Sequence, residues 1–394
     1  LGKAVLGSYS AGVLVYVWIR MLMFSFTLAC CVLMMGRLGL DGRLCNAAIA
    51  FFALAPHFPG FAITMGKDTN FALWTLVLVL MIITFIRAPR QALASRPQVA
   101  LFAVTLLMLC LLRNAGVYMV LALTPFMLVA ARRRIWMAAA VISGVCALSL
   151  VFTYAVLPAL HILPESRNAN LSIPFQQTAR YVKEHGGEVS PYERAAIDGV
   201  LDYARLADSY NPEISDPVKN LYRYGASPEA MSAYLKVWRE QFLKHPSTYF
   251  QSLLANGIGY LNPNAITHAK LYMIGFGVPT SLTDNPEYQR FFGFKEPHTA
   301  NQLAFFLKAL QTTPALSMVL SVGFYAWVLI LCIAYALSRR RFACLPAFAP
   351  PVIVLLGCLA SPVNAYFRYA LPMIVSVPVC VALCMWKGET RSAD

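Results

Sequence analysis

Charge is scarce in this sequence. Asp, Glu, Lys and Arg together make up 13% of the 394 residues, whereas hydrophobic residues make up 59%. Several apolar runs approach the roughly 20 residues that a bilayer-spanning helix needs. A chain with so little polar surface does not fit a water-soluble globular protein, and we expect a multipass membrane protein.

Familiar catalytic and metal-binding motifs are also missing. The sequence contains no GxSxG, HExxH or P-loop, and no GxGxxG in its proper context. Its six histidines show no metal-ligand spacing, and its ten cysteines all lie in or beside apolar runs, where they behave as small apolar residues. The sequence therefore predicts no metal site and no disulfide framework, and it leaves the cofactor unknown, a divalent cation included.

The net charge of +14 comes from a restricted part of the chain. Residues 161–313 contain 14 basic and 14 acidic residues, so the remaining 18 basic and 4 acidic residues supply the whole excess. These basic residues lie at the ends and loops of apolar segments, where positive charge marks the cytoplasmic side of a membrane protein. This distribution argues against nucleic-acid binding.

Nine apolar segments are predicted to span the membrane. The predicted fold class is an all-α integral membrane protein, a polytopic helical bundle with one mainly helical extracytoplasmic domain. The predicted spans are 9–36, 45–64, 70–86, 99–112, 115–131, 135–160, 315–337, 343–361 and 369–386. Residues 1–160 form an N-terminal transmembrane region, 161–313 a soluble domain, and 314–394 a C-terminal transmembrane region with a short tail. Pro56 and Pro59 are expected to break the second span.

Orientation follows from three arginine clusters, in residues 87–96, 132–134 and 338–341, which should be cytoplasmic. Strict alternation then places "GKDTN", "RNAG", residues 161–313 and "SPVNAYFRY" on the opposite face, with the C-terminus cytoplasmic. The same alternation places Leu1 outside. If the N-terminus of the whole protein is cytoplasmic, an odd number of further spans is expected before Leu1.

Within residues 161–313, two helices are predicted from their caps and apolar faces. Ser227 is a candidate N-cap, with Pro228 at the first helical position. Pro246 either ends this helix or starts the next one, "STYFQSLLANGIGYLNPN".

The candidate site combines polar residues that alternation places on one face. Asp68 is the only acid of the membrane part on the outer face, and Lys67, Arg113 with Asn114, and Arg368 share that face. A guanidinium fork matches a pair of phosphate oxygens. Each residue alone is equally explained as an interfacial charge, with Asp68 solvating a helix N-terminus. Together, three cations around one acid predict a site for an anionic, lipid-linked ligand.

Other polar residues are candidates for a buried charge or for substrate binding. Arg20 lies within the first span, where a charge costs roughly 2.5–3.5 kcal/mol or more unless it is paired, so it should face the bundle interior. Gln176, Gln177 and Arg180 follow the sixth span, and Asn364 precedes the ninth. Such side chains hold sugar hydroxyls, although amides of this kind more often cap or bridge loops.

An ordered set of motifs resembles a known group of proteins. The motifs are "GKDTNFALW", "LRNAGVYMVL", "SIPFQQTARYV", "YNPEISDPVKN", "FLKHPSTYFQSLLANGIGYLNP" and "FRYALPM". They resemble a bacterial family of uncharacterised multipass membrane proteins that is grouped with the GT-C superfamily of membrane glycosyltransferases. The resemblance covers nearly the whole chain.

The resemblance implies a multi-helix membrane domain with catalysis at the outer face and a polyprenyl-phosphate-linked sugar donor. It implies that Lys67, Arg113 and Arg368 bind the donor phosphate and that Asp68 is a second-rank catalytic acid. The principal acid of GT-C enzymes lies in a first outer loop, which we expect to precede this sequence.

The leading hypothesis is a glycosyltransferase that moves a sugar from a polyprenyl-phosphate carrier to an envelope glycan or protein at the outer face of a bacterial plasma membrane. Its partners would be the lipid-linked donor, the bilayer and the acceptor. One alternative is a transporter or flippase of lipid-linked precursors, for which inverted repeats would be expected. Another is a non-catalytic envelope scaffold, which a cation-lined cavity beneath the soluble domain would argue against.

Overall fold

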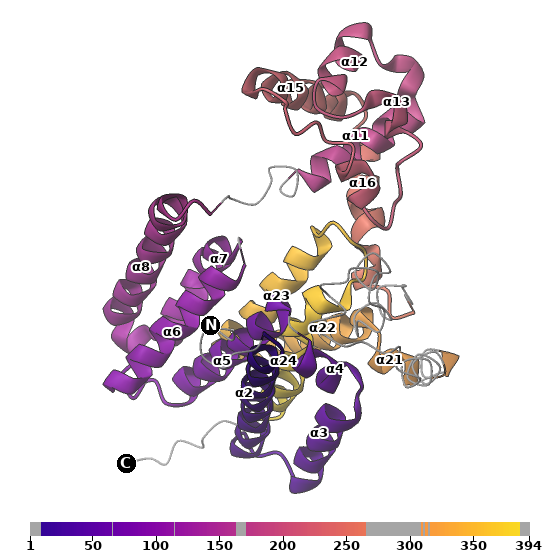
Figure 1. The fold of residues 1–394 in the computed structure, drawn as a ribbon. Helices are drawn as coiled ribbons and strands as arrows, with labels where there is room; N and C mark the ends of the chain where they lie inside the picture. Colours follow the sequence, from indigo (N-terminus) through magenta and orange to yellow (C-terminus); the bar gives the residue numbers. More distant parts are fainter. Residues whose placement is uncertain are drawn as a thin grey trace.

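The computed structural model describes residues 9–64, 66–113, 115–162, 171–264, 309, 312–313 and 316–386. These residues are mainly helical, and their only β-type pairings are two isolated bridges, Leu201 with Tyr222 and Ile214 with Val363. Figure 1 shows two parts, a bundle of long helices and a smaller helical lobe that stands above it.

The bundle contains the apolar helices. They are α2 (Tyr9–Arg37), α3 (Gly42–Leu54), α4 (His57–Ile63), α5 (Lys67–Arg87), α6 (Arg96–Leu112), α7 (Gly116–Ala130), η1 (Arg132–Arg134), α8 (Ile135–Val151), η2 (Phe152–Val156), α9 (Leu157–Ala159), α21 (Leu316–Val319), α22 (Val322–Ser338), η5 (Phe342–Cys344), α23 (Leu345–Leu359) and α24 (Phe367–Met385).

The helical lobe is built from shorter, more polar helices. They are α11 (Ser172–His185), η3 (Gly186–Glu188), α12 (Pro191–Asp198), α13 (Tyr203–Leu206), α14 (Asp216–Lys219), α15 (Pro228–Lys244), α16 (Pro246–Gly257) and η4 (Ile258–Tyr260). Its own hydrophobic core includes Phe175, Tyr234 and Val237, which are fully buried.

The apolar helices are those of a multipass membrane protein. Five helical stretches are individually long and apolar enough to span a bilayer, and α3 with α4, bent by 54° at their junction, make a sixth if they count as one span. Three of the predicted spans coincide with shorter apolar helices, α6, α7 and α22. The prediction of nine spans therefore exceeds the number that helix length alone supports.

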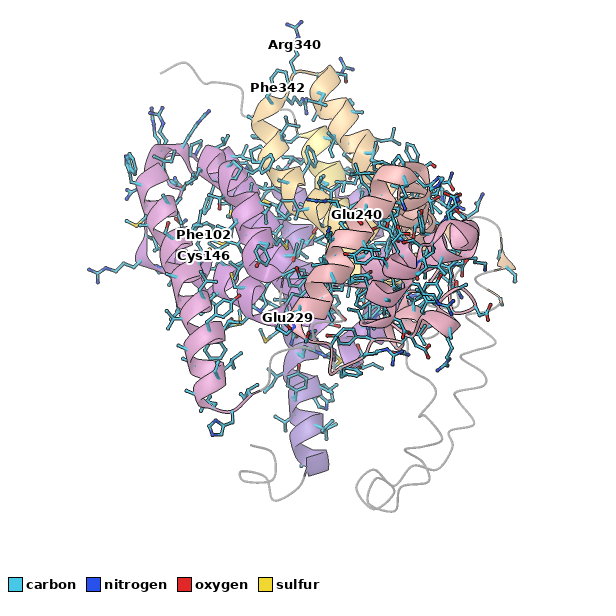
Figure 2. All side chains as sticks on the ribbon, turned by 90° about the horizontal axis from the view of Figure 1, so that it is seen from above. Phe102, Cys146, Glu229, Glu240, Arg340 and Phe342 are labelled. Atoms are coloured by element: carbon cyan, nitrogen blue, oxygen red, sulfur yellow. The ribbon has the colours of Figure 1, made fainter. Side chains whose placement is uncertain are left out.

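The two most enclosed helices of the bundle, α5 and α24, pack against each other at its centre. Their charged N-terminal ends meet, and α2, α22 and α23 surround them. By contrast, α2 and α8 expose Trp18, Phe26 and Trp136, which suits contact with lipid. Figure 2 shows Phe102 and Cys146 between α6 and α8, which pack at the other side of the bundle.

The hydrogen bonds of Arg20 explain how a charge is accommodated inside α2. Pro56 cannot donate a backbone hydrogen bond, so the helix breaks and restarts as α4. The end of α4 leaves carbonyls without helical partners. Arg20, which is only 2% exposed, donates to the Ala62 carbonyl at 3.0 Å and to the Gly66 carbonyl at 3.4 Å. The prediction that Arg20 faces the bundle interior is confirmed, and its contacts fix the start of α5.

Arginines gather at the end of the bundle opposite the start of α5. Side chains from α2, the α5–α6 loop and η1 line one pocket, which includes Arg37, Arg90 and Arg132. Arg341 donates to the carbonyls of Cys384 and Trp386 at the far end of α24. In Figure 2, Arg340 projects from the tip of the turn between α22 and α23. All three arginine clusters thus share one end.

The predicted caps of the lobe are present. The Ser227 hydroxyl accepts a hydrogen bond from the Ala230 amide at 3.2 Å, and Pro228 occupies the first helical position. Pro246 starts α16 after α15 has ended, so of the two alternatives it restarts the helical path.

The lobe is attached to the bundle through the loop between α23 and α24, residues 361–364. The Ser215 amide donates to the Pro362 carbonyl at 2.9 Å, and the Asn364 amide donates to the Glu213 carbonyl at 2.8 Å. The Asn364 side chain accepts from the Gly259 amide at 2.8 Å. A Cβ at Gly259 would lie 2.5 Å from that same oxygen, so only glycine allows this approach. The lobe is therefore seated directly beside the start of α24.

Candidate functional site

Asp68 joins two arginines that are distant in the sequence. Its Oδ1 accepts a hydrogen bond from Arg113 Nη2 at 2.7 Å, and its Oδ2 lies 3.6 Å from Arg368 Nε. The Asp68 side chain is 12% exposed, whereas those of Arg113 and Arg368 are 28% and 42% exposed. One nearly buried carboxylate thus holds two partly open guanidinium groups.

Local structure explains these positions. Lys67 and Asp68 begin α5, where a carboxylate is stabilised by the positive end of the helix dipole. Arg113 follows the last turn of α6, and the chain then turns sharply into α7. Gly116 makes this turn possible, because a Cβ there would lie 2.1 Å from the Leu109 carbonyl oxygen. Arg368 lies in the first turn of α24.

Aromatic rings fix the two guanidinium groups. The centre of the Arg113 guanidinium lies 5.0 Å from the centroid of the Phe71 ring and 5.2 Å from that of Tyr369. The Arg368 guanidinium lies 4.5 Å from the Tyr366 ring and 5.2 Å from Tyr369. Such cation–π contacts hold charged groups in place while leaving their N–H groups available. The sequence reasoning missed these rings, although Tyr366 and Tyr369 flank Arg368 in "AYFRYA".

The charged residues open into a cavity of about 690 Å³ between the bundle and the lobe. Lys67, Arg113 and Arg368 line it from the bundle, and Lys219 of α14 and Ser172 of α11 line it from the lobe. Lys219 is paired with Asp216, but Asp68 is the only acid among the lining residues of the described chain. The polar end of the cavity therefore carries excess positive charge.

The remaining wall of the cavity is apolar. It is formed by α7 and α23, which pack against each other, and its residues are Met119, Ala122, Ile353, Val354 and Leu356. Leu356 on α23 and Tyr118 on α7 also line the cavity and are 58% and 70% exposed. The cavity thus combines a basic end with an apolar wall.

Four further candidates serve as structural contacts of the lobe, and none of them lines this cavity. Gln176 donates to the Asn211 carbonyl. Gln177 donates to the Tyr249 carbonyl at 3.3 Å and accepts from the Trp238 indole at 3.1 Å.

The other two candidates are similarly engaged. Arg180 pairs with Glu184 at 2.8 Å, and Asn364 holds the Gly259 amide. All four side chains make contacts that cap or bridge loops and helices, as the alternative to sugar binding predicts. Sugar binding by these residues remains a prediction. Asn114 lies outside the described residues.

Among the described residues, one group has donors suited to a metal ion. His185, Glu188 and His245 bring their ligand atoms within 4.8 Å of one another on the lobe. They are not part of the cavity lining. The sequence could not reveal this group by local spacing, because 57 residues separate Glu188 from His245.

In a comparison with known protein families, one family model matches this chain over residues 1–394. The matching family is described as a family of unknown function, DUF6020. The chain belongs to DUF6020. No curated protein and no solved structure matches it. Membership of DUF6020 agrees with the resemblance to an uncharacterised membrane protein family and assigns no reaction, so the function has to be argued from the cavity.

Proposed function

We propose that this DUF6020 protein is a membrane glycosyltransferase that uses a polyprenyl-phosphate-linked sugar. The observation that carries the proposal is the cavity between bundle and lobe, basic at one end and apolar along α7 and α23. A lipid-linked phosphate has the same two-part chemistry, an anionic head and a long hydrocarbon tail. The GT-C resemblance supports this class of substrate by analogy.

In this proposal, Arg113 and Arg368 bind the donor phosphate and Lys67 adds a third positive charge. Arginine offers paired N–H donors that match two phosphate oxygens, and a hydrogen bond to a charged group contributes about 1.5–3 kcal/mol. The aromatic rings around both guanidinium groups hold them in advance of binding. The guanidinium groups themselves then need little movement when the phosphate replaces Asp68 as their partner.

The reaction would form a bond between an acceptor oxygen and the anomeric carbon and break the bond between that carbon and the phosphate oxygen. The electron pair of the broken bond leaves with the lipid phosphate, whose growing negative charge is stabilised by Lys67, Arg113 and Arg368. A carboxylate accepts the proton of the acceptor hydroxyl. We assign this role to Asp68, which the incoming phosphate displaces from the two arginines.

The proposed topology follows from the same arrangement. The arginine-rich end of the bundle is cytoplasmic, as positive charge near helix ends indicates. The cavity and lobe then face outward across a bacterial plasma membrane, the C-terminus lies inside, and all nine apolar segments cross. The acceptor is an envelope glycan or protein that approaches under the lobe. A scaffold would not require such a cavity, and a transporter is expected to place its binding site near the membrane midplane.

The test is transfer of sugar from synthetic polyprenyl-phosphate donors by the protein reconstituted in vesicles. We expect the triple variant Lys67→Ala, Arg113→Ala, Arg368→Ala to lose transfer. Arg37→Ala, Arg90→Ala, Arg132→Ala, which removes three cations from the opposite end, is the matched control and should retain it. Transfer by the cavity variant at the level of the control would overturn the assignment of the phosphate site.

A further inference from the structure

The distal end of the lobe contains two histidines that share one carboxylate. His245 Nε2 lies 2.8 Å from one Glu188 oxygen, and His185 Nδ1 lies 3.4 Å from the other. The two imidazole rings are stacked, with centroids 3.8 Å apart and planes inclined by 13°. His185 ends α11, Glu188 ends η3, and His245 separates α15 from α16.

A hydrogen-bond chain behind His185 is compatible with the tautomer that carries its proton on Nε2. Arg180 Nε lies 2.8 Å from a Glu184 carboxyl oxygen, and the other Glu184 oxygen faces Thr248. The Thr248 hydroxyl lies 3.3 Å from a Glu184 oxygen and 3.0 Å from His185 Nε2, and when it donates its one hydrogen to Glu184 it accepts from Nε2. In the neutral ring, Nδ1 then presents a lone pair.

That lone pair faces a carboxylate oxygen of Glu188. Two electron-rich groups at this separation repel each other unless a cation lies between them, either a proton on Nδ1 or a metal ion. An imidazole whose outer N–H is held by a hydrogen-bonded partner is the usual arrangement of a metal-binding histidine. Here Thr248 and Glu184 form that outer partner.

We propose that His185 Nδ1, His245 Nε2 and a Glu188 oxygen bind a zinc ion. Two imidazoles and one carboxylate are a ligand set that zinc uses, with a fourth position left for water or substrate. Tetrahedral bonds to zinc of about 2.0–2.1 Å place ligand atoms roughly 3.4 Å apart. The three ligand atoms already lie within 4.8 Å of one another, and the two stacked rings must turn out of their parallel arrangement so that both in-plane lone pairs point at one ion.

The position of the ion gives it a structural consequence. It ties the C-terminal end of α11 to the start of α16, so it clamps the distal ends of two helices that pack together. At the other ends of these helices, Ser172 of α11 lines the basic cavity, and Asn256 of α16 donates to the Ser361 carbonyl in the loop between α23 and α24. Zinc would therefore stiffen the part of the lobe that covers the cavity.

The experiment measures zinc binding directly, without an activity assay. Purified full-chain protein is stripped with chelator and titrated with ZnCl₂ at pH 7.5 by calorimetry, and metal content is checked by elemental analysis. We expect one zinc per chain, with affinity at least a hundredfold lower in His245→Gln and in Glu188→Gln. Thr248→Val removes only the outer partner and should lower affinity roughly 10–100-fold.

Two controls separate zinc binding from other causes. Glu188 is 56% exposed in its side chain, so Glu188→Gln should fold normally, and circular dichroism verifies this for every variant. His161→Gln changes an exposed histidine outside the cluster and should bind zinc like wild type. Absence of bound zinc, or equal affinity in Glu188→Gln and wild type, would overturn the proposal and assign the cation between His185 and Glu188 to a proton.

Discussion

Replacing Asp68 by Asn tests how the two arginines of the cavity are held. The change removes one negative charge while keeping nearly the same side-chain shape. Arg113 and Arg368 then lose the carboxylate that lies 2.7 Å and 3.6 Å from them, with no second acid lining the described cavity. The two cations remain beside each other and repel.

The cost can be bounded from the exposures of the three side chains. Removing one partner of a fully buried ion pair costs about 3–5 kcal/mol, and exposed pairs contribute about 0–1 kcal/mol. Asp68 is 12% exposed, but water reaches both arginines, so we place the loss at about 1–3 kcal/mol. For a chain of this size, that loss corresponds to a fall in Tm of roughly 1–4 °C.

A phosphate should reverse part of this loss, because it can replace the missing carboxylate. A ligand at one hundred times its Kd stabilises the folded state by about 2.7 kcal/mol. In wild type the phosphate must also displace Asp68 from the arginines. We therefore expect undecaprenyl phosphate to raise the Tm of Asp68→Asn by more than it raises that of wild type.

The assay is thermal unfolding of detergent-purified protein with and without undecaprenyl phosphate. Asp41→Asn is the matched control, because Asp41 caps α3 through the Arg43 amide at 3.0 Å and Asn caps helices equally well. It should change Tm little. Equal melting of Asp68→Asn and wild type, with equal ligand shifts, would refute the account of Asp68 as the counter-ion of the pair.

Four other variants test three separate features. Arg113→Gln and Arg368→Gln should each weaken undecaprenyl phosphate binding about 10–100-fold, the loss of one charge-assisted contact, while Arg133→Gln leaves the titrated Kd unchanged. Gly259→Ala should loosen the lobe, because its Cβ would lie 2.5 Å from Asn364 Oδ1; faster hydrogen exchange at residues 259–260 and 363–364 measures this, and Gly225→Ala, with nothing within 4 Å, should exchange like wild type. Burial raises the pKa of Glu193, but hydrogen bonds from Lys244 and the Ser190 amide outweigh it and lower the pKa overall. The stabilising contribution of the Glu193 carboxylate is therefore complete above pH ~4.3, and it is lost as the pH falls through the lowered pKa of the folded state. The Tm measured between pH 6 and pH 3 should therefore fall less steeply with decreasing pH in Glu193→Gln than in wild type.

Sequence patterns predicted the elements that depend on local chemistry. Apolar runs located the bundle helices, and Ser227 with Pro228 located the start of α15. Alternation of the spans placed Asp68, Arg113 and Arg368 on one face, where the structure joins them. Some boundaries differed, since the span predicted at 315–337 is divided into α21 and α22 near Ser321.

Features that depend on contacts distant in sequence could not be predicted in this way. The seat of the lobe on residues 361–364 depends on Gly259 and Asn364, which are 105 residues apart. Lys219 enters the cavity only because this docking brings α14 over the bundle. Similarly, His185 and His245 become neighbours only when α11 packs on α16. Neither the hydrophobic periodicity of a segment nor the spacing of residues within a motif indicates contacts of this kind.

The central claim is that the cavity holds the phosphate and the first part of the tail of a polyprenyl lipid. Its most direct test is photo-crosslinking with a polyprenyl phosphate that carries a photoreactive group near the phosphate, followed by peptide mapping. We predict adducts on α7 and α23, around Met119 and Val354, that unlabelled undecaprenyl phosphate competes away and that Arg113→Gln with Arg368→Gln abolishes. Adducts spread over the exposed faces of α2 and α8, and equal in the variant, would contradict the claim.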